Sequence, residues 1–445
     1  MDDENERCAH DDEEYAQLSL LRLLRVIGRR VGVLPGPIRR KKKKSLLDLP
    51  VEMFLHICSF LDASTLVHGL SLVCKQFYLI LKDDDLLWKA RIDHILPNAS
   101  HSLLCPERPD KLFWKLSCVA IEKQAALWKH NSMKKLKLSK RYYDATSVLL
   151  MPVDGITYLV GAGHQRLFCK KLSYREEPFY EVEDINLEPP YALQTSLTAI
   201  DHTVYSCRSG NTVKSWMLTN TSLVYDRTYE IQCDKVYGLQ DVSSCPEQAL
   251  FATGSFHGTI YVFDSRSSSN KPYRQYQPHT TKVNKLAMNT EYILSASWDE
   301  TVSVWDQRAG RIMKSIRIPD KATPECVSMR RDNWVCVADS KAKLHMLDPK
   351  NDFKLVKSYS TEATCSYPLP ALTGVHLTHG CLITSWNSSD GTIVRILSPT
   401  NPPKPITTKL LKREFICSGT TDYLNDILVV AGQKLVIWRP RNRRV

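Results

Sequence analysis

The sequence has few of the features that mark an enzyme or a metalloprotein. Its fourteen cysteines are scattered and none forms a Cys-x-x-Cys pair, so neither a zinc site nor a disulfide framework is predicted. Free thiols in that number fit a reducing compartment. No nucleophile–base constellation, phosphate-binding loop or metal-ligand spacing rises above chance, and the histidines are dispersed. We therefore expect no catalytic residue, no cofactor, no bound metal and no enzymatic activity.

The N-terminal segment lacks a secretory signal, because residues 1–14 are acidic where such a signal is basic. Residues 15–34 have an apolar helical face opposite an arginine face, and their four arginines argue against a membrane span. This amphipathic helix can pack on a partner, pair with a second copy to form a homodimer, or lie on an acidic membrane. The other outcome for such a segment is a weakly ordered tail.

The net charge of +12 is concentrated in the tails, so binding to nucleic acid is not expected. Residues 39–44 (RRKKKK) supply six of the positive charges and resemble a nuclear-import signal. The alternative for this run is a solvated linker. We expect residues 1–44 to form a tail and the protein to be cytoplasmic, nuclear or both.

Residues 45–91 are dense in apolar side chains arranged in three short helices. Asp48 and Leu49-Pro50 start the first helix, and Asp62 caps the second. The second helix is expected to carry Leu66, Leu70 and Val73, the third to carry Phe77, and Trp88 to close the unit. So small a unit cannot bury all these side chains, so its remaining apolar face needs a partner.

The order of these residues, LPxE…I…FLD…L…L.LVCK.F…LWK, resembles the F-box. The resemblance implies that this segment docks on the Skp-type adaptor of a cullin-RING ubiquitin ligase. It implies an adaptor face that partly buries Leu49, Pro50, Ile57, Leu61, Leu66, Leu70, Val73, Phe77 and Trp88. The alternative is an ordinary helical core packed on the rest of the chain.

After the F-box, residues 92–133 are a linker in which 110–130 are predicted to be a helix that ties the F-box to the C-terminal part of the chain. From residue 134 onward, short β-rich runs alternate with turns and repeat. The runs end at Lys170, Trp216, Phe263, Trp305, Leu347, Ile396 and Trp438, which are spaced 42–49 residues apart. That spacing is the length of one four-stranded β-propeller blade.

The repeats resemble WD repeats, which implies a seven-bladed propeller over residues 134–445. The predicted fold is thus a multidomain chain that joins an α-helical F-box and linker to an all-β propeller. In the fourth repeat, His279, Asp299, Trp305 and either Ser295 or Ser297 match the family's hydrogen-bonded network. The last blade lacks an outer strand, which we expect residues 134–141 to supply, because an open ring would expose two sheet edges.

An F-box followed by WD repeats resembles the substrate receptors of SCF-type ubiquitin ligases. Relatives bind ligands on the face that carries the turn between the second and third strands of each blade. On that face Phe256 and Trp298 are candidate anchors, with packing across blades as the alternative. The basic groups nearby suit an acidic or phosphorylated segment, namely His164, Arg208, His257 and Lys341.

Two other functions compete with the ligase receptor. Residues 293–308 fit the WDxR box by which some WD-repeat proteins dock on the adaptor of cullin-4 ligases, with Asp299, Trp305, Asp306 and Arg308 matching. The box overlaps the ordinary repeat pattern, so a structural role is the alternative. The second competitor is a propeller scaffold that assembles partners without ubiquitin transfer.

Overall fold

The computed structural model describes residues 49–82, 85–95, 113–129, 132–137, 145–163, 167–172, 195–208, 210–219, 223–231, 238–330, 332–361, 372–400, 402–412, 421–431 and 435–441. The predictions for residues 15–34, residues 39–44 and Asp48 lie outside them. The chain divides into two compact units. One ends at Ala126 and also includes His379–Cys381 and Ser398–Lys404, and the other contains the remaining residues from Leu127 onward.

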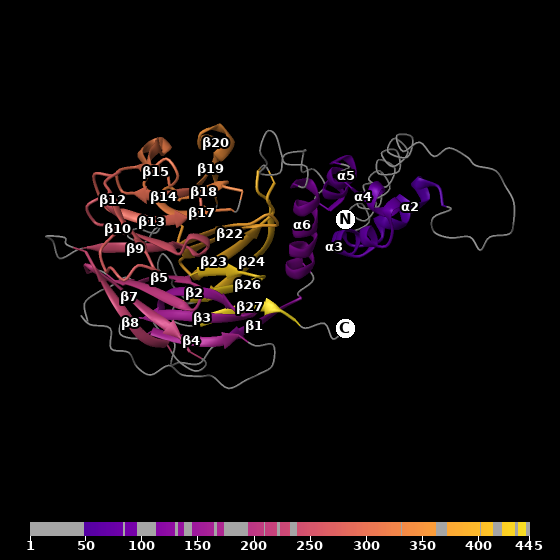
Figure 1. Ribbon diagram of the computed structural model, residues 1–445. Coiled ribbons are helices and arrows are strands. Elements are labelled where there is room, and N and C mark those ends of the chain that lie inside the picture. The colour runs from indigo at the N-terminus through magenta and orange to yellow at the C-terminus, as the bar shows by residue number, and fades with distance from the viewer. Residues whose placement is uncertain are drawn as a thin grey trace. The chain divides into compact units, whose positions relative to one another are not determined.

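The first unit is built from short helices (Figure 1). They are α2 (Val51–Ser59), α3 (Ala63–His68), the 3-10 turn η2 (Leu70–Leu72), α4 (Lys75–Leu81), α5 (Asp85–Ile95) and most of α6 (Phe113–Lys129). Asp62 caps α3 as predicted, because its carboxylate accepts a hydrogen bond from the Thr65 N–H at 2.8 Å. Pro50 is the N-cap residue of α2 and supplies no side-chain hydrogen bond. α6 falls within the helix predicted for residues 110–130.

The second predicted helix is shorter than the sequence pattern indicated. α3 ends at His68, and Leu70 lies in η2 with Val73 directly after it. Gly69 explains the break, because glycine has low helix propensity and a Cβ there would lie 2.8 Å from the Thr65 carbonyl oxygen. Trp88, which was predicted to close the unit, lies in a further helix, α5, and is buried in the core of this unit.

One apolar core joins all these helices. Phe54 and Phe77 stack with ring centroids 4.4 Å apart, and Trp88 is almost completely buried beside them. Glu122 of α6 adds a polar clamp: its carboxylate accepts a hydrogen bond from the Ala63 N–H at 2.5 Å and pairs with Arg91. The first part of α6 is therefore an integral part of this unit.

The second unit contains seven antiparallel sheets among the described residues (Figure 1). The first three are β2 (Ala145–Val153), β3 (Ile156–Gly163), β4 (Leu167–Leu172); β5 (Thr195–Ile200), β6 (Thr203–Arg208), β7 (Thr212–Leu218), β8 (Leu223–Glu230); and β9 (Leu239–Cys245), β10 (Leu250–Ser255), β11 (Ile260–Asp264), β12 (Arg274–Tyr276). The next two are β13 (Val283–Met288), β14 (Tyr292–Ser297), β15 (Thr301–Asp306), β16 (Arg311–Arg317); and β17 (Pro324–Met329), β18 (Val335–Asp339), β19 (Lys343–Asp348), β20 (Lys354–Ser360). The last two are β21 (Gly374–Leu377), β22 (Leu382–Ser388), β23 (Gly391–Leu397), β24 (Pro405–Lys412); and β25 (Thr421–Leu424), β26 (Ile427–Ala431), β27 (Leu435–Pro440) with β1 (Met133–Lys137).

The seven sheets are the blades of a closed propeller. The inner strands contact one another in the order β2, β5, β9, β13, β17, β21 and β25, and β25 contacts β2 again. The outer strand of the seventh blade is β1, which pairs antiparallel with β27 so that Lys135 lies opposite Trp438. This is the closure that the sequence predicted, and it leaves no free edge on β27.

Polar side chains connect neighbouring blades near the propeller axis. The Asp241 carboxylate of the third blade accepts a hydrogen bond from the Leu286 N–H of the fourth at 2.8 Å. The Lys285 ammonium lies 3.1 Å from the same carboxylate. Asp422 of the seventh blade similarly accepts from the Leu150 N–H of the first at 2.6 Å. Asp241, Lys285, Leu286 and Asp422 line a central cavity of ≈ 190 Å³.

Candidate functional site

The helical unit exposes large apolar side chains on α2, η2 and α4 and directly after α2 and η2. Phe60 after α2 is 77% exposed, Leu72 of η2 is 75% exposed and Val73 is 67% exposed. The other large apolar side chains exposed on α2 and α4 are Met53, Ile57, Tyr78 and Leu79. We refer to these seven residues as the apolar helix face. Exposed clusters of this kind mark interaction surfaces in water-soluble domains.

The nine residues predicted for adaptor binding divide into three groups. Leu66, Phe77 and Trp88 are buried inside the helical core, so they are inaccessible to a partner. Leu49, Leu61 and Leu70 are half-buried, and Pro50, Ile57 and Val73 are exposed. Sequence reasoning missed Met53, Phe60, Leu72, Tyr78 and Leu79, because a pattern of apolar residues does not say which of them a short helix turns outward.

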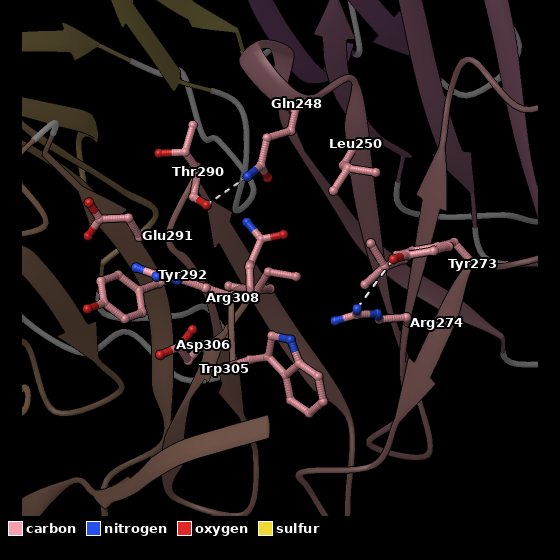
Figure 2. Close-up of a pocket in the computed structure, with 13 residues that line it drawn as sticks. Gln248, Leu250, Tyr273, Arg274, Thr290, Glu291, Tyr292, Trp305, Asp306 and Arg308 are labelled. Atoms are coloured by element: carbon pink, nitrogen blue, oxygen red, sulfur yellow. Dashed lines mark hydrogen bonds between the residues drawn. The ribbon is translucent and has the colours of Figure 1, made fainter. Parts of the chain in front are cut away.

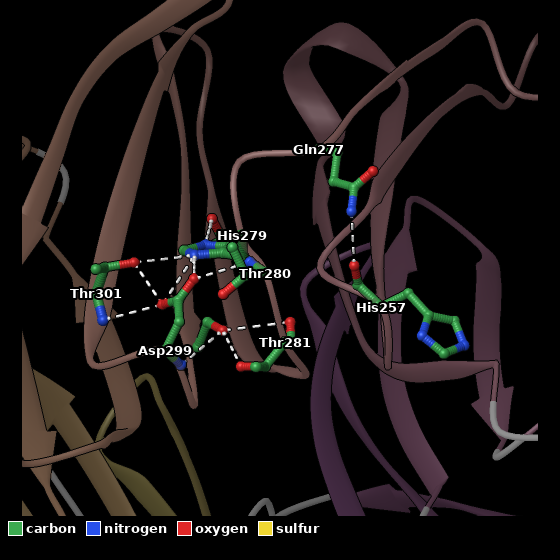
Figure 3. A network of polar contacts seen from close by, with 9 residues as sticks. His257, Gln277, His279, Thr280, Thr281, Asp299 and Thr301 are labelled. Carbon is green, nitrogen blue, oxygen red and sulfur yellow. Dashed lines mark hydrogen bonds and ion pairs between the residues drawn. The ribbon is translucent and has the colours of Figure 1, made fainter.

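The fourth blade contains a buried polar network at the turn between β14 and β15 (Figure 3). His279 Nδ1 lies 3.0 Å from the Asp299 carboxylate, and its Nε2 lies 2.8 Å from the Ser295 hydroxyl. Asp299 also accepts hydrogen bonds from the backbone N–H groups of Thr280 and Thr301, both at 3.1 Å. The network therefore locks the turn. Both serines join it, because Ser295 contacts His279 and Ser297 accepts a hydrogen bond from the Asp299 N–H at 3.3 Å.

The environment of this network favours a neutral imidazole. Burial lowers the pKa of His279, although the neighbouring Asp299 charge opposes that effect. For Asp299, burial raises the pKa but hydrogen bonds from Thr301 and His279 outweigh it, so the net direction is downward. Trp305, predicted as a member, instead stacks on Tyr276 of the third blade with ring centroids 3.9 Å apart.

The fifth blade replaces this network with a different one. Lys341 occupies the position in this repeat that Asp299 occupies in the fourth, but the carboxylate that holds this turn belongs to Asp339. Asp339 accepts hydrogen bonds from the Lys341 N–H at 2.9 Å and the Lys343 N–H at 2.7 Å, and contacts His345 Nε2 at 2.9 Å. The aspartate and the histidine were both visible in the sequence, two positions before and four positions after the expected one.

The turns between second and third strands carry exposed aromatic residues. Phe256 is 37% exposed and Trp298 is 50% exposed, so both keep some surface that a partner could contact. The Lys282 ammonium lies 4.8 Å from the centre of the Trp298 ring, and the His257 ring meets Phe256 edge-on. The Lys341 ammonium hydrogen-bonds to the Asp320 carbonyl oxygen. The side chain of Arg208 and all of His164 lie outside the described residues.

A larger hollow lies at the opposite end of the blades, between the third and the fourth (Figure 2). Its volume is ≈ 610 Å³, and we call it the blade 3–4 cleft. Thr290 and Glu291 reach it from the β13–β14 turn and Arg308 from the β15–β16 turn. Because consecutive strands are antiparallel, these turns lie at the end of the blade away from Trp298.

The cullin-4 motif at residues 293–308 is mostly engaged in the fold. Asp299 is held by His279, and Trp305 stacks on Tyr276. The Asp306 carboxylate accepts a hydrogen bond from the N–H of Ala309 at 2.8 Å and so closes the next turn. Arg308 is the member that stays exposed.

The described cysteines have the chemistry of packed core residues. All nine are free thiols, and eight of them are buried. Burial raises the pKa of Cys58 to about 11 and that of Cys169 to about 12. Such thiols are protonated near neutral pH and are poor nucleophiles. No group of three or more His, Cys, Asp or Glu side chains in the described ranges is arranged to hold a metal ion.

Among the helices that the structure describes, none combines the length and the apolar character that a membrane span requires.

Comparison with known families defines the class of this protein. Residues 46–92 match the family model described as F-box-like, and residues 270–306 match the model for the WD domain, G-beta repeat. The chain therefore has the architecture of F-box/WD-repeat proteins: an F-box-like helical segment followed by a seven-bladed propeller.

Individual relatives agree with this class. The chain is 26% identical over 418 residues to F-box/WD repeat-containing protein 9 of Homo sapiens, covering 88% of this chain and 82% of that protein. Ribosome biogenesis protein YTM1 of Kluyveromyces lactis is 35% identical over 127 residues, 27% of each chain. A chain in "Crystal Structure of Mitotic Checkpoint Complex" matches with a TM-score of 0.53 and 13% identity, covering 69% of this chain and 91% of that one, which shows the fold alone.

Proposed function

We propose that this protein is the substrate-recognition subunit of an SCF-type ubiquitin ligase. The F-box-like unit docks on a Skp-type adaptor within a cullin-RING complex, and the propeller holds a protein substrate. The observation that carries the proposal is the apolar helix face, which lies within the F-box-like match at residues 46–92. A surface of that composition in a segment of that family requires a protein partner.

The protein contributes binding and positioning in this scheme and carries no active site of its own. A substrate held on the propeller gains a high effective concentration near the enzyme that transfers ubiquitin. The exposed Phe256 and Trp298 make the face with the β10–β11 and β14–β15 turns a candidate substrate surface. We further propose that the protein acts in the cytoplasm, the nucleus or both.

The competing functions have less support. Three of the four matching residues of the cullin-4 motif contact other residues of the propeller. Docking on the cullin-4 adaptor would therefore depend on Arg308 alone. The similarity to a ribosome biogenesis protein covers 27% of this chain, and the WD-repeat fold alone is enough to explain a match of that extent. A scaffold without ubiquitin transfer would leave the apolar helix face without a partner.

The test is co-purification of the full chain with a Skp-type adaptor. We expect the wild-type chain to form a one-to-one complex on size-exclusion chromatography. An Ile57→Asp/Val73→Asp variant should lose the complex, because it places two charges on exposed positions of the apolar helix face. If the wild-type chain does not bind the adaptor, or the variant binds equally well, the proposal is wrong and the scaffold function takes its place.

A further inference from the structure

The blade 3–4 cleft has the size of a ligand site. Its ≈ 610 Å³ lies within the range of about 300–1,000 Å³ that is usual for binding pockets. Residues of the β9–β12 blade face residues of the β13–β16 blade across it (Figure 2). The Gln248 side chain spans the two blades at one end, because its amide nitrogen donates a hydrogen bond to the Thr290 carbonyl oxygen at 2.9 Å.

One part of the cleft wall is an aromatic surface that is firmly supported. Trp305 lines it, and the indole is backed by the Tyr276 ring at 3.9 Å between centroids with planes 19° apart. Leu250 and Ile293 add aliphatic surface beside it. A rigid aromatic surface of this kind is a suitable anchor point for an apolar side chain of a ligand.

Unsatisfied polar groups are available at the same site. The side-chain oxygen of Gln248 is buried and accepts no hydrogen bond within the described part of the chain. Arg274 and Arg308 are exposed, and within the described residues neither forms an ion pair. Arg274 contacts Tyr273 instead, with its guanidinium 5.0 Å from the ring centre.

The two acidic groups of the cleft each accept a hydrogen bond from a neighbouring residue. Glu291 accepts a hydrogen bond from the side chain of Asn333 at 2.7 Å, and Asp306 accepts one from the Ala309 N–H at 2.8 Å. Within the described residues neither guanidinium group pairs with a carboxylate, and planar guanidinium groups bind carboxylates and phosphates in two-pronged geometry. An anionic ligand would supply the partner that Arg274 and Arg308 lack.

We propose that the blade 3–4 cleft binds an extended peptide segment of a partner protein in which an apolar side chain is flanked by anionic residues. The apolar side chain packs on Trp305, the anionic groups pair with Arg274 and Arg308, and a peptide N–H donates to the Gln248 oxygen. The anionic residues are either carboxylates or phosphorylated side chains. The site lies at the end of the blades opposite Trp298, so it leaves the proposed substrate surface free.

The test measures fluorescence anisotropy of fluorescein-labelled peptides with the full chain. Three probes carry two glutamates on each side of a central pair of leucines, phenylalanines or tryptophans. Matched peptides replace all glutamates by glutamine or by phosphoserine, or replace the central pair by glycine and serine. We expect at least one anionic, apolar peptide to bind, and we expect its glutamine and glycine–serine counterparts to bind at least about tenfold more weakly. Whether glutamate or phosphoserine binds more tightly identifies the source of the anion, and either order supports the site.

Variants locate the binding. Arg274→Glu/Arg308→Glu should weaken binding of the anionic peptide at least about tenfold. A higher salt concentration should also weaken binding of this peptide to the wild-type chain. The matched control is Lys357→Glu, an equal charge change per site at an exposed position on β20. It should change binding less than about twofold, because it lies on another blade. The proposal is overturned if no probe binds at a protein concentration of about 1 mM, if the glutamine peptides bind equally well, or if the double arginine variant binds like the wild type. Adaptor binding is a separate measurement and can succeed or fail independently.

Discussion

Replacing two residues of the apolar helix face with serine should weaken adaptor binding strongly without unfolding the chain. Phe60 and Leu72 are 77% and 75% exposed, so the fold gains little from them and a partner has most of their surface left to bury. Full burial of such a side chain is worth roughly 1.5–3 kcal/mol. Three quarters of that amount for two residues is roughly 2.3–4.5 kcal/mol, which corresponds to a rise in Kd of about 45- to 2,000-fold.

The assay is isothermal titration of a purified Skp-type adaptor into wild-type chain and into Phe60→Ser/Leu72→Ser. Val224→Ser/Tyr225→Ser is the matched control, since these residues are 50% and 52% exposed on β8 of the propeller. The control should bind like the wild type, and all three proteins should unfold at similar temperatures. A change of less than about threefold in the double variant of the helix face would refute the assignment of this surface, because it would place both side chains outside the interface.

Three further predictions concern stability. Burial lowers the pKa of His279 and of His376, so these histidines bind protons more readily in the unfolded chain than in the folded one. The folded protein is therefore most stable above the unfolded pKa of about 6.5 and loses stability as the pH falls below it. Tm by differential scanning fluorimetry should drop between pH 7.5 and 5.5, and less steeply in His279→Gln; a Tm that stays constant or rises would contradict this. Asp241→Ala should lower the free energy of unfolding by about 3–5 kcal/mol, because it leaves the Lys285 charge and the Leu286 N–H without their partner. Asp241→Leu/Lys285→Met should recover part of this loss in thermal unfolding. Equal Tm values for the wild type and Asp241→Ala would rule out a structural role for the pair. Phe77→Ala should destabilise the helical unit by about 3–5 kcal/mol, seen as faster proteolysis of that unit alone, whereas unchanged proteolysis would show that the Phe54–Phe77 stack contributes little.

The sequence predicted the architecture because its strongest signals are repetitive. A period of 42–49 residues over seven runs needs no single blade to match well, and edge closure then requires an outer strand before the first run. β1 at Met133–Lys137 meets that requirement. Helix boundaries were harder, because the break at Gly69 depends on a close approach to Thr65 that a pattern of apolar residues does not contain.

The functional surfaces were predicted less well for a physical reason. A sequence reports which residues are apolar, but exposure depends on how short helices pack, so Phe77 and Phe60 look alike until one is buried and the other is 77% exposed. The blade 3–4 cleft is formed by residues from two repeats, including Gln248, Arg274 and Arg308. No repeat alignment places them together, because they occupy different positions within their repeats.

The pairing of β1 with β27 also constrains how the protein is made. Lys135 lies opposite Trp438, so the two strands are separated by 303 residues of chain (438 − 135 = 303). During synthesis β1 emerges from the ribosome long before its partner, and at about 5–20 residues per second it waits roughly 15–60 s with an unpaired edge. Bringing such distant strands together costs about 5 kcal/mol of chain entropy by the logarithmic scaling of loop closure. Pairing of β1 with β27 therefore occurs only in a chain that has been synthesised through β27. A chain that ends earlier leaves the edges of β1 and β26 unpaired and is open to chaperones and proteases.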